Sequence, residues 1–180
     1  MKYQGLIGMA AVSFLLASCA GTDVETHDGQ EVAEDQAGSG KLRRGANVYV
    51  AQPADRVTAK STNPNSGRAT AAAIANELKP FAGRVMRGTS VQMLDVALHD
   101  AQQNGAEYLI YPSIIRWDDK RTDWGANRSA VQVQLSVYES VSGKQVDAML
   151  LQGTGKVFGD EVSPESLLKD PLQRYYKSVY

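Results

Sequence analysis

The strongest constraint on the fold is a series of three apolar segments near the middle of the chain. Residues 108–117, YLIYPSIIRW, are apolar on both faces of an extended chain, which is typical of a central strand. Residues 129–139, SAVQVQLSVYE, alternate apolar and polar side chains and predict a strand with one exposed face. After a turn at 140–144, residues 145–156 predict the hairpin partner, whose inward side chains are expected to be Val146, Ala148 and Leu150. These segments therefore predict an antiparallel meander.

The residues before this meander predict two strand–helix units. Asn47 to Gln52 form the first strand, and residues 70–81 form a helix with Thr70 as its N-cap. A short strand over 84–88 is followed by a helix that begins near Val91, capped by Thr89 or Ser90, and ends at Asn104-Gly105. A last helix is expected after Asp170-Pro171.

This order predicts a single small domain of class α/β (α+β), arranged β-α-β-α-β-β-β-α. The sheet is expected to be mixed, with an antiparallel meander at its end and the helices on one face. A chain of 180 residues is long enough to bury one substantial core.

The N-terminus carries a short charged region and an apolar run. Met1-Lys2 precedes thirteen uncharged residues, 5–17, which suit a signal sequence and are too short to span a bilayer. The next residues, Leu16, Ala17, Ser18 and Cys19, resemble the lipobox of bacterial lipoproteins. The resemblance implies cleavage after Ser18 and acylation of Cys19, so that membrane lipid is the first partner of the chain. The alternatives are an ordinary secretory signal with a chance cysteine, or a buried free thiol, since Cys19 is the only cysteine.

Charge divides the remaining chain into two parts. Six acids and no Lys or Arg lie between Ala20 and Gly40, whereas the residues from Lys41 onward carry 18 basic and 14 acidic side chains, an excess of +4. We expect a signal peptide over 1–18, an acylated cysteine with a flexible acidic tether over 19–45, and a globular domain over 46–180. The positive excess is too small for a nucleic-acid partner.

Ala20 stands where an Asp retains enterobacterial lipoproteins at the inner membrane, so the comparison implies the outer membrane, with the domain facing the periplasm.

Two longer stretches resemble a known family. "AQQNGAEYLIYPSIIRWDD" and "VQVQLSVYESVSGKQVD", through their GAEYLIYP, RWDD and SGK elements, are similar to bacterial lipoproteins that share domain of unknown function 4823. The resemblance covers about residues 45–180 and the signal. It implies a location and a fold rather than a chemistry. At the level of topology the domain also resembles the N-terminal domain of the periplasmic protein TolB.

Few residues suggest catalysis. His99 is the domain's only histidine and lies off the apolar stripe of its predicted helix, and no GxSxG or P-loop pattern is present. Asp118, Asp119 and Asp123 lack the glycine and distal glutamate of an EF-hand. We therefore expect a protein that is not an enzyme, with no catalytic residues, metal or cofactor.

The best candidate for a contact surface is the loop after the central strand. Trp and Arg are enriched at binding hot spots, and both gather here with acids: Arg116, Trp117, Asp118, Asp119, Arg121, Trp124 and Arg128. A solvated hairpin loop is the alternative, and of the two tryptophans Trp117 is the one expected to pack on the sheet.

The favoured function is an outer-membrane-anchored, non-catalytic lipoprotein that binds an envelope protein or a peptidoglycan-associated partner. The alternative is a lipoprotein that binds glycans or small anions, through this loop or the helix N-terminus that follows loop 55–68.

Overall fold

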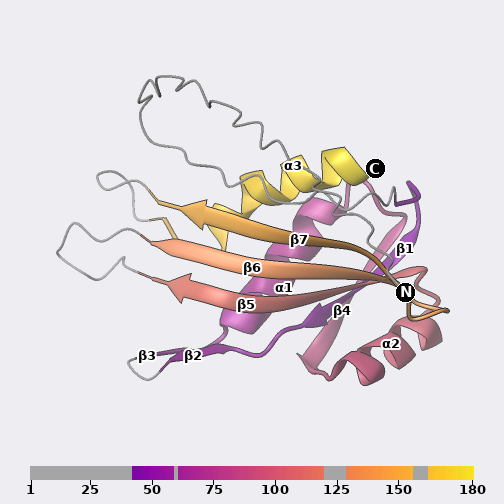
Figure 1. Ribbon diagram of the computed structural model, residues 1–180, viewed down its shortest axis with the longest axis horizontal. Coiled ribbons are helices and arrows are strands. Elements are labelled where there is room, and N and C mark those ends of the chain that lie inside the picture. Colours follow the sequence, from indigo (N-terminus) through magenta and orange to yellow (C-terminus); the bar gives the residue numbers. More distant parts are fainter. Residues whose placement is uncertain (1–41, 59–60, 120–128, 156–161) are drawn as a thin grey trace, which may run out of the picture. The chain divides into compact units, whose positions relative to one another are not determined.

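A computed structural model describes residues 42–58, 61–119, 129–155 and 162–180. Its centre is a five-stranded mixed sheet in the order β4-β1-β5-β6-β7 (Figure 1). β1 pairs in parallel with β4 and β5, whereas β5, β6 and β7 form an antiparallel meander. The strand bounds are β1 Asn47–Gln52, β4 Arg84–Val91, β5 Tyr108–Asp118, β6 Ala130–Glu139 and β7 Gln145–Thr154. The predicted fold class, a single α+β domain with a mixed sheet and an antiparallel meander, is confirmed.

Three α-helices and one 3-10 turn complete the described elements: α1 Ser66–Leu78, α2 Leu94–Gln103, η1 Ser166–Leu168 and α3 Lys169–Val179. A small hairpin of β2, Arg56–Thr58, and β3, Ser61–Asn63, lies in the segment that the sequence suggested to be a loop. Within the described residues, no helix has the length and hydropathy needed to cross a membrane.

The helices lie on both faces of the sheet, so the prediction that they share one face is wrong. Val48 and Val50 of β1 belong to the larger core, which α1 and α3 cover, whereas Tyr49 and Ala51 belong to a smaller core with α2. In Figure 1, β5 and β6 pass in front of α1. The chain moves outward from β1 to β4 and then returns across β1 to β5. Because both crossovers are expected to be right-handed, opposite directions of travel place α1 and α2 on opposite faces.

The side chains of β7 that point toward the larger core also differ from those that the sequence predicts. Asp147, Met149 and Leu151 lie opposite Val137, Leu135 and Val133 of β6, and therefore share the face of the larger core. The register shifts at Val137/Tyr138, where Val146 is the extra residue. The expected inward positions Ala148 and Leu150 point to the other face, because one inserted residue reverses the alternation.

Candidate functional site

Strand β5 contains a bulge that decides which of its side chains face the larger core. Its pairing with β6 is regular as far as Ile114 and shifts before Arg116. Ile110 and Ile114 are buried before the bulge, and Trp117, only 7% exposed, is buried after it. Because the inserted residue reverses the alternation of faces, Trp117 enters the larger core.

The predicted contact residues are therefore divided between core and surface. Trp117 packs on the sheet, as the sequence suggested, and does not present an exposed ring. The Arg116 Nε atom donates to Asp118 Oδ2 at 2.6 Å, and the side chains are 54% and 34% exposed, respectively. Asp119 is half-buried. Partner binding by this loop remains a prediction, because three of its members lie outside the described residues: Arg121, Trp124 and Arg128.

The other residues considered for chemistry are placed separately. His99 is exposed on α2. In the ranges that the structure describes, no group of three or more His, Cys, Asp or Glu side chains could hold a metal ion.

The N-terminus of α1 already holds a carboxylate from the same chain. Asp55 accepts hydrogen bonds from the backbone amides of Gly67, at 2.7 Å, and Asn65, at 3.0 Å. These amides are the groups that an external anion would use. The sequence-based alternative of a free anion site after loop 55–68 is therefore wrong for this helix end.

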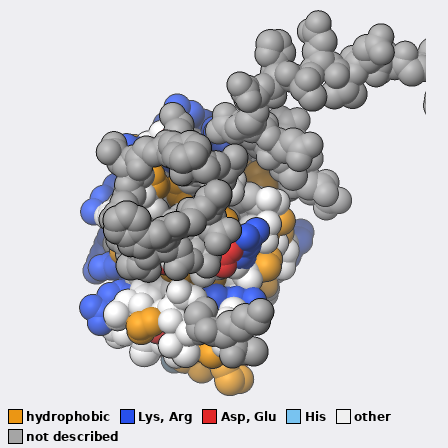
Figure 2. All heavy atoms as spheres, turned by 90° about the vertical axis from the view of Figure 1, so that its left-hand side faces the viewer, with side chains coloured by type: hydrophobic (Ala, Val, Ile, Leu, Met, Phe, Trp, Pro, Cys, Tyr) orange, Lys and Arg blue, Asp and Glu red, His pale blue; other side chains and the backbone are white. Residues whose placement is uncertain are grey.

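Four exposed cations lie on the helices that cover the larger core. Exposed cations of α1 and α3 are Arg68, Lys169, Arg174 and Lys177. Seen from the end of the sheet at which β5 and β7 finish, Lys and Arg side chains gather along one side (Figure 2).

A polar network holds the junction between β4 and α2. The Tyr49 hydroxyl donates to Gln92 Oε1 at 3.1 Å, and Gln92 Nε2 donates to Asp100 on α2. The Tyr111 hydroxyl donates to the Gln92 carbonyl at 3.0 Å. Burial, and then the nearby Asp100 carboxylate, raise the pKa of Tyr49 above its ordinary value of 10.0, against the effect of the Gln92 bond. Tyr49 therefore stays a donor at neutral pH, and Gln92 is fixed through both its side chain and its backbone.

The residues on either side of Gln92 are apolar and exposed. Val91 is 56% exposed and Met93 is 70% exposed, and Val96 on the first turn of α2 is 47% exposed. We call these three residues the β4–α2 knob. They are half of the six large hydrophobic residues that are exposed in the described part of the chain. Such clustering is typical of a contact surface.

Sequence reasoning did not find the knob. Thr89 and Ser90 are good N-caps, so the helix was expected to start at them, but both belong to β4. The sequence offered one clue: α2 begins with LDVAL, and the residue immediately before it is not Ser, Thr, Asp or Asn.

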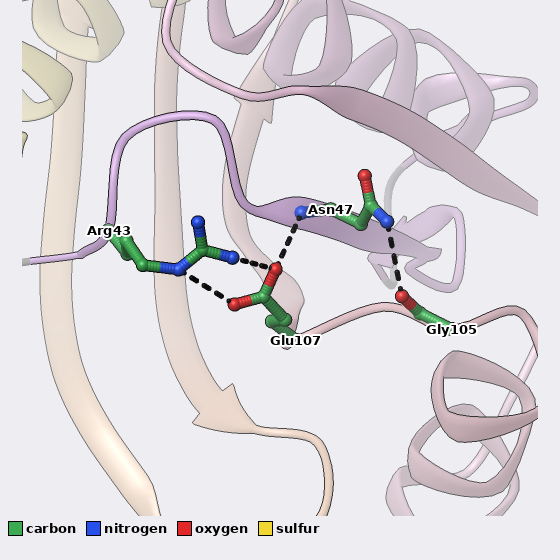
Figure 3. Close-up of polar contacts among 4 residues, drawn as sticks. All are labelled: Arg43, Asn47, Gly105 and Glu107. Atoms are coloured by element: carbon green, nitrogen blue, oxygen red, sulfur yellow. Dashed lines mark hydrogen bonds and ion pairs between the residues drawn. The ribbon is translucent and has the colours of Figure 1, made fainter.

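A second arrangement fixes the start of the folded domain (Figure 3). The Arg43 guanidinium makes two hydrogen bonds with the Glu107 carboxylate, one of them from Nε at 3.0 Å. The Asn47 amide donates to the same carboxylate at 3.4 Å, and Asn47 Nδ2 donates to the Gly105 carbonyl. The bond to Arg43 is the main cause that lowers the pKa of Glu107 below its ordinary value. The residues before β1 are thus held against the start of β5.

The same segment contacts the end of α3. The Leu42 amide donates to the Val179 carbonyl at 2.7 Å, and Arg44 Nε donates to the Tyr180 carbonyl at 3.1 Å. The Arg44 guanidinium also lies over the Phe81 ring, 5.6 Å from its centre. Leu42 is buried. The point at which the preceding chain enters the domain is therefore set by several contacts.

The family model for the domain of unknown function DUF4823 matches residues 40–179. The chain belongs to the DUF4823 family. The match contains all the described elements from β1 to α3 and confirms the family expected from the sequence. No curated protein matches the sequence.

Solved structures share the fold of this DUF4823 domain at low sequence identity. A PelC dodecamer from Paraburkholderia phytofirmans is 21% identical with a TM-score of 0.60, covering 75% of this chain and 90% of that one. Lipoprotein GNA1162 from Neisseria meningitidis is 14% identical with a TM-score of 0.51, covering 74% of this chain and 97% of that one. TolB from Acinetobacter baumannii matches at 13% identity and a TM-score of 0.37, over 79% of this chain and 29% of that one. The PelC and GNA1162 likenesses show a shared fold.

Proposed function

We propose that the chain is a non-catalytic lipoprotein, anchored in the bacterial outer membrane, whose domain over 46–180 binds another component of the envelope. The observation that carries this proposal is the sequence Leu16-Ala17-Ser18-Cys19 after an apolar run. Acylated Cys19 would anchor the chain, because each buried methylene of an acyl chain contributes about 0.8 kcal/mol. The fold that the domain shares with lipoprotein GNA1162 supports the proposal.

The contacts of Leu42 and Arg43 would connect the proposed anchor to the folded domain. The 22 residues between Cys19 and Leu42 would span at most about 75 Å when fully extended. Because Leu42 is tied to α3 and Arg43 to β5, a load on this segment would act on the folded sheet and helices. The domain would thus be held within a fixed distance of the membrane.

Fatty-acid labelling tests the anchor. The full chain is expressed in a bacterial host with an alkyne-bearing fatty acid, and the label is detected after membranes are fractionated. We expect label in the outer-membrane fraction for the native chain and none for Cys19→Ala. Label that persists in Cys19→Ala, or a native chain without label, would reject the anchor.

Photo-crosslinking tests the binding role. A photoreactive residue at position 124 in the full lipoprotein is expected to give a protein adduct that depends on Cys19, and mass spectrometry identifies the adduct. The matched control places the same group at Val141, which is 83% exposed on the β6–β7 turn. Equal adducts from both positions, or none from 124, would reject the loop as the contact. A ligand screen by thermal shift would then test the alternative of glycan or small-anion binding.

Assembly of several copies is a second candidate function. It is favoured by the fold shared with PelC, whose solved structure is a dodecamer. Sedimentation of the detergent-extracted full chain tests it directly, and a monomer at all concentrations would reject it.

A further inference from the structure

Residues 42–46 form a strap across one end of the larger core. Leu42 is buried in that core, and its amide donates to the Val179 carbonyl at 2.7 Å. Three residues later, the Gly45 amide donates to the Phe81 carbonyl at 2.9 Å. The strap therefore connects the last residue of α3 with the segment that follows α1, just before the chain enters β1.

Two glycines allow the strap to lie close to the segment after α1. Gly45 has φ 74°, in the left-handed region that favours glycine. The Gly83 amide donates to the Ala46 carbonyl at 3.0 Å. A Cβ added at Gly83 would lie only 2.3 Å from the Gly45 carbonyl oxygen. A side chain at position 83 would therefore displace the strap.

The strap lies against two aromatic residues at the edge of the larger core. Phe81 stacks on Tyr180, with 5.5 Å between the ring centres, and both residues are partly buried. The Arg44 guanidinium lies over the Phe81 ring, and Arg44 Nε donates to the Tyr180 carbonyl. Removal of the strap would uncover this aromatic pair and the place that Leu42 occupies in the core.

The strap is held more weakly than the strand that follows it. The three backbone bonds described above go to separate residues, and the Arg43–Glu107 ion pair is exposed. β1, in contrast, pairs in parallel with β4 on one side and β5 on the other, and its four central residues are buried. A load on the chain before Leu42 would reach the bonds of the strap one after another, whereas the bonds of β1 would share it.

We infer that the strap is a release element: a load on the preceding chain detaches residues 42–46 while the sheet stays folded. The inference rests on the proposed anchor only for the source of the load. Detachment would add at most about 17 Å to the reach of the domain, because an extended residue spans about 3.4 Å. It would also expose the Phe81–Tyr180 pair, so that this apolar surface becomes accessible only when the chain is stretched.

Single-molecule pulling tests the order of release in the full chain. One handle is attached at Gly38→Cys, before the strap, and the other at Val141→Cys, which is 83% exposed on the β6–β7 turn. We expect a short, reversible extension at a lower force than the unfolding of the sheet. A single unfolding step with no earlier extension would overturn the inference.

Two variants connect the first extension to the strap. Leu42→Ala removes its buried side chain, and Gly83→Ala displaces it, so each is expected to abolish the first step or move it to lower force. The matched control is Gly155→Ala, where an added Cβ would be in ordinary contact with the Ser129 carbonyl oxygen at 3.5 Å. This control is expected to keep the native first step. A first step that neither strap variant alters would overturn the inference.

Hydrogen exchange of the full chain gives a second test without load. In Gly83→Ala, and equally in Leu42→Ala, the amides of residues 42–46 and of the last turn of α3 are expected to exchange about tenfold faster, while those of β1 keep the native rate. Unchanged exchange at the end of α3, or an equal increase in β1, would overturn the inference. Neither experiment uses the acyl group, so an unlabelled Cys19 would reject the anchor and leave the release of the strap standing.

Discussion

The Tyr175 hydroxyl on α3 donates a 2.7 Å hydrogen bond to Asp147 Oδ2 on β7, inside the larger core. The other carboxylate oxygen, Oδ1, accepts the Ala148 amide at 2.8 Å. Both Tyr175 and Asp147 are buried. A buried carboxylate is tolerated only when its oxygens are hydrogen-bonded, so this pair ties the last helix to the edge of the sheet.

Tyr175→Phe is expected to lower the free energy of unfolding by about 1–3 kcal/mol, because Asp147 Oδ2 would lose its donor in the core. Urea unfolding followed by circular dichroism measures the change. Tyr138→Phe, at a half-buried position beside the smaller core, is the matched control and is expected to change stability less. Equal losses in the two variants would show that the Asp147 bond contributes nothing specific.

Stability is expected to fall at alkaline pH because of the C-terminal tyrosines. Burial is the largest cause that raises the pKa of Tyr175 and Tyr176 well above 10, and it raises the pKa of Tyr180 to about 12. The unfolded chain loses these protons near pH 10, whereas the folded chain keeps them. The contribution of these tyrosines to the free energy of unfolding is therefore fully present below about pH 10 and declines as pH rises above that value. Urea unfolding between pH 8 and 11, with about one-unit steps, should show a shallower decline in Tyr175→Phe. The same slope in both proteins would contradict the assignment.

Asp55→Ala is expected to destabilise the domain by about 0.5–2 kcal/mol, because Asn65 and Gly67 lose the carboxylate that accepts their amides. Thermal unfolding measures the effect. The control is Asp170→Ala in the first turn of α3, where no side-chain cap bond is formed and only the helix dipole is affected. If Asp170→Ala lowers stability as much as Asp55→Ala does, the hydrogen bonds of Asp55 are not the cause of the loss.

Glu107→Ala is expected to open the start of the domain to trypsin at Arg43 and Arg44, with little change in the unfolding midpoint. The Arg43–Glu107 pair is exposed, so its effect is local. Because the pKa of Glu107 is lowered in the fold, the pair holds at neutral pH and weakens as acid protonates the carboxylate. Asp118→Asn removes a different exposed pair and serves as the control. Cleavage rates that match those of the native chain would argue against a clamp.

Trp117→Ala is expected to lower stability by about 3–5 kcal/mol, since the ring is only 7% exposed in the larger core. Arg116→Ala, on the exposed side of the same strand, is expected to change stability by less than about 0.5 kcal/mol. Urea unfolding compares the two. A small loss for Trp117→Ala would place the ring outside the core and return it to the contact surface.

The sequence predicted the elements whose periodicity is local. The strand predicted over 47–52 has the same bounds in the structure. The alternation in 129–139 corresponds to β6, in which the four apolar positions are buried: Val131, Val133, Leu135 and Val137. The end of α2 was marked by Asn104-Gly105, where Gly105 has φ 69°. The burial of Trp117 was expected, but the bulge that produces it was not.

Family and general architecture could thus be read from the amino-acid sequence, because side-chain periodicity and glycine positions act over a few residues. The face that α2 covers, the inward turn of Asp147 and the exposed Met93 were decided only by the tertiary structure. They depend on the strand order, on the bulges at Ile114/Arg116 and Val137/Tyr138, and on the network around Gln92. Each of these joins residues from separate elements. One inserted residue turns the following side chains of its strand to the other face of the sheet, and the direction of a crossover decides which face its helix covers.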